Sequence, residues 1–112
     1  MKRIFVIAIV TALLFACSKN PETASVDCSG PVKSFGANAN PVIQTFCATG
    51  SNCHGAGSSN GPGPLLNYSQ VFNARSDIQE AVLSGHMPPD RGLSATEKAA
   101  IICWIRNGAL ND

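Results

Sequence analysis

The chain has 112 residues, of which 45% are hydrophobic and 13% charged, and its formal net charge is +1. This length is sufficient for one small domain. The balanced charge excludes a strongly basic or acidic surface and so argues against a nucleic acid or an anionic membrane as a partner.

The first residues are typical of a secretory signal peptide. Met1-Lys2-Arg3 is basic, and the apolar stretch that follows ends at Ala16. This stretch is too short to favour a permanent membrane span. Leu14-Phe15-Ala16-Cys17 resembles a bacterial lipobox, in which the signal is cut before the cysteine; the alternative is an ordinary signal with a nearby cysteine. The resemblance implies that Cys17 is lipidated.

We therefore expect three parts: a signal peptide over 1–16, a lipidated N-terminus and polar tether over 17–30, and a domain over 31–112. The lipid would be the only membrane anchor, and two or three acyl chains hold a protein firmly. The exported protein would face the periplasm or the cell exterior, and Ser18 after the lipidated cysteine favours the outer membrane.

Three helices have recognisable starts. Asn40-Pro41 is a cap followed by a proline suited to the first turn, and Val42, Ile43 and Phe46 follow as an apolar face. Ser76 to Gln79 has the pattern of a capping box, and Gly85 ends that helix. A short turn of helix over Ser69 to Asn73 precedes it. Ser94 to Glu97 is a second capping box, followed by Ile101, Ile102, Trp104 and Ile105 and ended by Gly108. No strand pattern is present.

The segment from Cys47 to His54 reads C-A-T-G-S-N-C-H. A C-x-x-C-H run marks covalent haem attachment, and here the two cysteines lead into a histidine with five residues between them. Two thiols can add to the two haem vinyl groups, and the imidazole of His54 can bind iron. The wider gap departs from the usual spacing, and its three extra residues must bulge outward.

Two loops accompany this motif. Gly50 to Leu66 is rich in Gly, Ser, Asn and Pro, and a loop of this length in a small domain is usually functional or disordered. Gly85 to Gly92 contains Met87 followed by two prolines, which stiffen it. Met87 is the candidate for the second axial ligand, because its thioether is carried on this stiff loop far along the chain from His54. Histidine with methionine raises the reduction potential of haem iron, which suits electron transfer.

Each of the five cysteines can be given a separate role. If Cys17 carries lipid and Cys47 and Cys53 hold haem, Cys28 and Cys103 remain. Disulfides persist outside the cytoplasm, so we expect these two to form one. It would close a loop of roughly 75 residues and contribute about 4 kcal/mol in the chain-entropy model.

The order of these features resembles class I cytochrome c, and more closely the secreted single-haem domains with a widened C-x(5)-C-H motif. The resemblance covers roughly Val32 to Asn111 and includes Cys47 to Ala56, Gly61 to Leu65, Gly85 to Pro89 and Trp104 to Ala109. It implies an all-α, cytochrome c-like fold of three to four short helices wrapped around one haem. It also implies that the first and last helices pack with Phe46 and Trp104 near their contact.

The same resemblance implies a set of residue roles. Cys47 and Cys53 would carry one haem c through thioethers, and His54 and Met87 would bind its iron. A proline carbonyl, from Pro62 or Pro64, would accept the ring N–H of His54 and orient it. An apolar wall would be supplied by Leu65, Leu66, Phe72, Val82 and Ile101.

The expected function is one-electron transfer to redox protein partners in the periplasm or at the cell surface, by a monomer with no catalytic residues and no nucleic-acid partner. One alternative is a haem-free binding module held by two disulfides. Another is a zinc site formed by Cys47, Cys53, His54 and His86, whose nitrogen and thiolate ligands suit zinc. A haem peroxidase would need an open distal site with His86 as its acid–base residue.

Overall fold

The computed structural model describes residues 25–112, so the expected signal peptide and Cys17 lie outside the described residues. The described part contains one turn of π-helix, η1 (Phe35–Ala39), and four α-helices: α1 (Asn40–Phe46), α2 (Tyr68–Asn73), α3 (Arg75–Leu83) and α4 (Ala95–Arg106). It contains no strand, as the sequence predicts. None of its helices is long and apolar enough to cross a membrane.

The first helical segment begins earlier than the sequence indicates. Ser34 has an extended backbone, and its hydroxyl accepts a hydrogen bond from the Ala37 N–H at 3.1 Å. η1 then continues into α1 without a break, so Asn40 is already helical and does not act as the cap. Pro41 lies in the first turn of α1 directly after the π-helical turn, and it has no N–H to donate back to that turn.

The expected capping box at Ser76 is also absent. α2 is capped by Asn67, whose side chain accepts from the Gln70 N–H. Ala74 ends α2 and begins α3, and no side chain caps α3. Because the two helices abut at Ala74, Ser76 falls inside α3, where its hydroxyl cannot serve the free N–H groups of the first turn.

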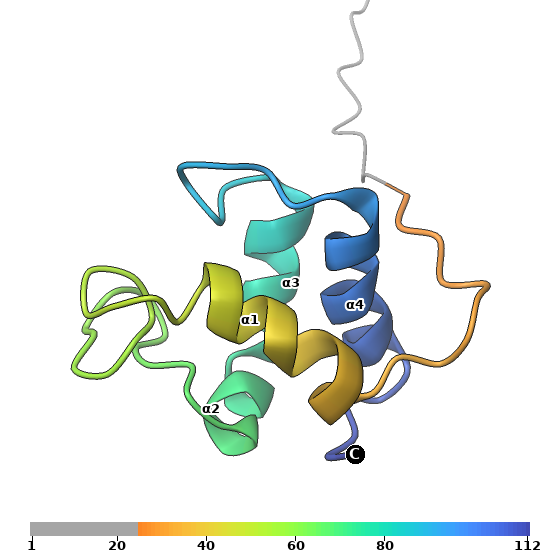
Figure 1. Ribbon diagram of the computed structural model, residues 1–112, viewed down its shortest axis with the longest axis horizontal. Helices are drawn as coiled ribbons and strands as arrows, with labels where there is room; N and C mark the ends of the chain where they lie inside the picture. Colours follow the sequence, from red (N-terminus) through yellow and green to blue (C-terminus); the bar gives the residue numbers. More distant parts are fainter. Residues whose placement is uncertain (1–24) are drawn as a thin grey trace, which may run out of the picture.

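α4 is the central helix of the core. Its capping box forms as predicted, between Ser94 and Glu97, and its buried residues include Ile101, Ile102 and Trp104. It contacts η1, α1 and α3, as Figure 1 shows for α1 and α3. The helices thereby form one all-α domain around an apolar cluster.

The aromatic partner of Trp104 differs from the expected one. The rings of Phe35 and Trp104 lie 5.3 Å apart between centroids, and Tyr68 adds a second ring against each of them. Phe46 lies at the other end of the η1–α1 segment, and a different side chain, Arg91, covers its ring. The contact between the first and last helices is therefore built around Phe35.

The predicted disulfide between Cys28 and Cys103 is present, with 5.4 Å between the two Cα atoms. It joins the segment before η1 to the middle of α4. The other end of the chain is held by Asp112, whose carboxylate accepts from the Phe35 N–H at 2.9 Å. Both ends of the described chain are thus tied to the helices, and the segment expected to be tether already contacts them at Cys28.

The two long loops, 47–67 and 84–94, extend toward the same side of the helices, to the left in Figure 1. The segment 25–34, which precedes η1, runs along the right of the same view.

Candidate haem site

The residues expected to attach and coordinate haem are gathered around one hollow. Cys47, Cys53, His54 and Met87 all line a cavity of about 500 Å³ between the two loops. A second cavity of about 240 Å³ shares three of them, Cys47, His54 and Met87. The two cavities therefore meet at these side chains, which come from segments more than 30 residues apart in the sequence.

Cys47 is placed by the end of α1. Its N–H donates to the Ile43 carbonyl at 2.8 Å, which makes it the C-cap of that helix. Burial, and to a lesser degree the neighbouring Cys53, raises the pKa of the Cys47 thiol to about 11. The thiol is therefore neutral at physiological pH. Cys47 and Cys53 are both half-buried and unpaired.

The widened spacer is folded into a compact bulge. The His54 N–H donates to the Cys47 carbonyl at 2.9 Å, and both the Cys53 and Gly55 N–H groups donate to the Gly50 carbonyl. A Cβ atom on Gly55 would lie 2.7 Å from the Gly50 nitrogen, so this close approach requires glycine. The spacer's extra residues thus turn back and bring both cysteines and His54 to the same cavity.

The His54 ring is oriented by the backbone of the glycine-rich loop. Its Nδ1 lies 3.1 Å from the carbonyl oxygen of Gly63. A carbonyl oxygen can only accept, so Nδ1 is the donor and Nε2 keeps its lone pair for a metal. The sequence predicts the carbonyl of Pro62 or Pro64 as the acceptor, whereas the structure has the carbonyl of Gly63, which lies between them.

Gly63 is the acceptor because the loop turns at this residue. Gly63 has a φ of 83°, which proline cannot adopt, and its N–H donates to the Asn60 carbonyl at 2.9 Å. This turn presents the Gly63 oxygen to the ring. Pro62 lines the smaller cavity, whereas Pro64 is not among the residues lining either cavity.

Met87 enters the site from the opposite loop. It is half-buried and follows α3 closely, and its N–H donates to the Ala81 carbonyl at 3.1 Å. Pro88 behind it is buried. The adjacent His86 is exposed, although it lines the smaller cavity.

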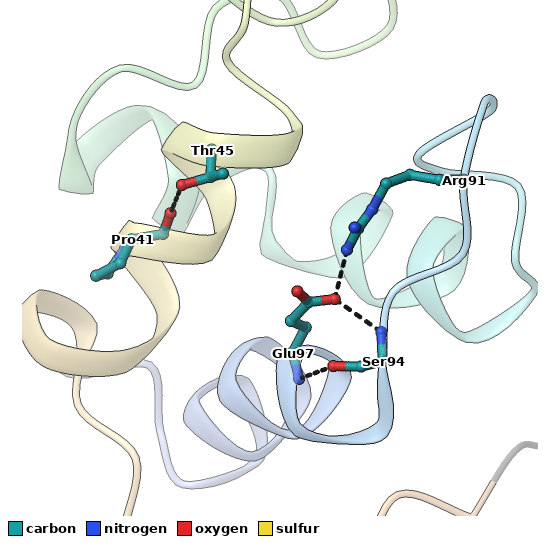
Figure 2. Close-up of polar contacts among 5 residues, drawn as sticks. All are labelled: Pro41, Thr45, Arg91, Ser94 and Glu97. Atoms are coloured by element: carbon teal, nitrogen blue, oxygen red, sulfur yellow. Dashed lines mark hydrogen bonds and ion pairs between the residues drawn. The ribbon is translucent and has the colours of Figure 1, made fainter.

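The far end of this loop is fastened to α1 and α4 by Arg91. Its guanidinium carbon lies 3.9 Å from the centroid of the Phe46 ring. Its Nη2 lies 2.6 Å from a carboxylate oxygen of Glu97, and the same oxygen accepts from the Ser94 N–H (Figure 2). The pKa of Glu97 is lowered, mainly by the Ser94 N–H and less by Arg91. The carboxylate is therefore charged at neutral pH.

In the figure, Thr45 in the last turn of α1 also donates to the Pro41 carbonyl, at 2.7 Å. This contact is the i−4 hydrogen bond that a threonine hydroxyl can make within a helix.

The apolar wall differs in part from the predicted set. The smaller cavity is lined by Leu65 and Val82, as expected, together with three further apolar residues: Ile43, Ile78 and Ala81. Of the other expected residues, Leu66 is 43% exposed and Ile101 is fully buried in the helical core. Phe72 lies beneath Arg75.

Ile43 could have been predicted as a lining residue from the sequence, because it precedes Cys47 by four residues and therefore lies on the same face of the helix.

Within residues 25–112, no three His, Cys, Asp or Glu side chains are arranged to hold a metal ion. The four residues of the zinc alternative therefore form no such group. Comparison of the chain with protein family models, with curated proteins and with solved structures finds no match. The functional conclusion depends on the residues of the site itself.

Proposed function

We propose that this protein is a c-type cytochrome of the class I kind, which carries one haem and transfers single electrons outside the cytoplasm. Cys47 and Cys53 form the thioethers, and His54 and Met87 bind the iron from opposite sides. The supporting observation is that these four side chains, drawn from two loops, line a single cavity while a backbone carbonyl holds Nδ1 of His54.

The donor set fits a haem iron better than a free metal ion. An imidazole with a free Nε2 and a thioether are the ligands found at electron-transfer haems. In the part of the chain that the structure describes, no group of three His, Cys, Asp or Glu side chains is arranged as a zinc site would require. The lining of Leu65, Val82 and Ile78 matches the apolar faces of a porphyrin.

When bound, the haem supplies a one-electron couple at iron. The protein's residues set its environment: Gly63 fixes the ring of His54, the proline-backed loop holds Met87, and the apolar wall limits water. Two protein ligands on the iron leave no open position for a substrate, so the proposal is a carrier and not an enzyme.

The proposed location rests on the expected lipidation of Cys17 and on the disulfide. An exported lipoprotein with Cys17 lipidated would present the domain to the periplasm or the cell exterior, and a disulfide between Cys28 and Cys103 is stable there. Its partners would be redox proteins, met by a monomer held at the membrane through lipid, with the outer membrane favoured.

Two alternatives are less well supported. A haem-free binding module with two disulfides would pair Cys47 with Cys53, but both are free thiols. A peroxidase would need His86 directed over the haem, but this residue is exposed.

The direct experiment is expression of the whole chain, with the expected export signal over 1–16, in a bacterium that matures c-type haem. The reduced spectrum in alkaline pyridine should have the position of a haem with two saturated vinyl groups. Cys47→Ser and Cys53→Ser should each shift the band to that of a single attachment, whereas Ser51→Ala in the same bulge should leave it unchanged. Colourless protein from such a host would contradict the proposal.

A further inference from the structure

Loop 84–94, here called the Met87 loop, is held at two points. Near its start the Met87 N–H donates to the Ala81 carbonyl of α3 at 3.1 Å. Near its end Arg91 contacts α1 and α4. Pro88 and Leu93 of the loop are also buried, and Arg91 is the residue of the second contact that lines the larger cavity.

The Arg91 contacts use both features of a guanidinium group. Its flat face covers the Phe46 ring at 3.9 Å, and its edge donates to Glu97 at 2.6 Å. A planar cation with several donors can do both at once, whereas a lysine ammonium cannot. Phe46 directly precedes Cys47, and Arg91 itself lines the larger cavity. The Arg91 contact therefore joins the Met87 loop to the end of α1, directly before Cys47.

The segment between Met87 and Arg91 can transmit this restraint. It contains Pro88 and Pro89, whose rings fix φ, and Pro88 is buried. A stiff connection of three residues couples the position of the Met87 thioether to that of Arg91. Displacement of Arg91 would therefore loosen the thioether side of the site, and the Met87 contact with Ala81 would open more often.

We propose that Arg91 is a positioning residue, which holds the Met87 loop closed and sets how easily an external ligand displaces the Met87 thioether from the iron. This inference rests on the proposed function. Arg91 does not touch the iron and acts through the loop alone.

The test uses the haem-loaded ferric protein and imidazole as the competing ligand. Loss of the weak sulfur-to-iron band at the red end of the spectrum reports displacement of Met87. In Arg91→Gln the imidazole concentration at half-displacement should fall by about threefold to tenfold, the combined effect of an exposed cation–π contact and an ion pair. Arg91→Lys keeps the charge and should recover part of the difference.

Arg75 provides the matched control. Its guanidinium lies over the Phe72 ring at the same distance, 3.9 Å, but Arg75 lines neither cavity. Arg75→Gln should leave the imidazole titration unchanged. Glu97→Gln should have little added effect in the Arg91→Gln background, because the partners act as one unit.

A second measurement follows the loop directly. Hydrogen exchange of the Met87 amide, whose acceptor is Ala81, should be about threefold to tenfold faster in Arg91→Gln than in the parent. If Arg91→Gln does not accumulate with haem, Arg91→Lys serves for both measurements.

The outcomes separate the two proposals. A parent protein with haem and the sulfur band, but with titration and exchange unchanged in both Arg91 variants, would overturn the role of Arg91 and leave the cytochrome proposal intact. A parent that takes up no haem would overturn both. An equal shift in Arg75→Gln would show a general loss of stability and would also reject the specific role.

Discussion

At the scale of single residues, the site depends on a few groups whose chemistry is set by their immediate surroundings. The backbone carbonyl of Gly63 selects the tautomer of His54, and burial keeps the Cys47 thiol neutral. Gly55 permits a contact that any side chain would prevent. These local conditions give each residue one role that can be tested separately.

Met87 should be the second iron ligand. Met87→Ala in the haem-loaded protein should abolish the sulfur-to-iron band and lower the reduction potential by on the order of 0.2 V, within the roughly 0.8 V that axial ligands span. The visible spectrum and a redox titration measure both effects. His86→Ala, one position away and exposed, is the control and should change neither. An unaltered band in Met87→Ala would exclude methionine ligation.

Cys47 in haem-free protein should react slowly with iodoacetamide at mildly alkaline pH. A pKa raised from 9.0 to about 11 leaves about a hundredfold less thiolate than in an ordinary cysteine below pH 9. Mass spectrometry of the alkylated peptide, over a pH series, measures the rate.

In the folded protein the alkylation rate of Cys47 should still rise with pH above pH 9, because most of the thiol is still protonated at that pH. The same cysteine in urea is the control and should reach its plateau near its ordinary pKa. A plateau near pH 9 in the folded protein would contradict the effect of burial.

At the scale of elements, helix ends decide where the loops start. α1 ends at Cys47 and α3 ends just before the Met87 loop. α4 begins where that loop returns. The capping box of α4 also supplies Glu97, the partner of Arg91. Local helix signals therefore position the two loops that form the cavity.

The two serines predicted as caps should behave differently. Ser94→Ala should lower the free energy of unfolding by about 1 kcal/mol, because it leaves the Glu97 N–H without its acceptor. Ser76→Ala should have almost no effect, since Ser76 lies inside α3 and caps nothing. Urea denaturation of both variants measures the difference, and equal effects would refute the observed start of α3.

At the scale of the whole molecule, the ties that hold the chain ends and the cavities at the expected haem-binding residues are formed by different side chains. The disulfide and the contacts of Asp112 fasten the chain ends to the helices. The two cavities are lined by Cys47, His54 and Met87 and by neither residue of the disulfide. Stability and haem binding should therefore be separable by mutation.

Removal of the disulfide should destabilise the fold without loss of haem. Cys28→Ala with Cys103→Ala should lower the free energy of unfolding by about 2–4 kcal/mol, because the unfolded chain regains the freedom of a loop of 75 residues. Urea denaturation measures this, and the pyridine spectrum should match that of the parent. Loss of covalent haem in the variant would contradict the separation.

Much of this arrangement could be predicted from the sequence because it depends on neighbours along the chain. The all-α class, the last helix with its capping box at Ser94 and the Cys28–Cys103 pair are confirmed. Cys47, Cys53, His54 and Met87 are among the residues that line the larger cavity, and their haem-binding roles stay a prediction. Periodicity, caps and cysteine use are local or countable signals.

The tertiary structure decided which groups meet across the fold. The acceptor for His54 is Gly63 because the loop turns there, and Phe35 contacts Trp104 because η1 extends the first helix. Arg91 reaches Phe46 across 45 positions of sequence. Such contacts depend on how distant segments pack, and the free energies that favour one partner over another are small sums over many atoms, with no signature in residue spacing.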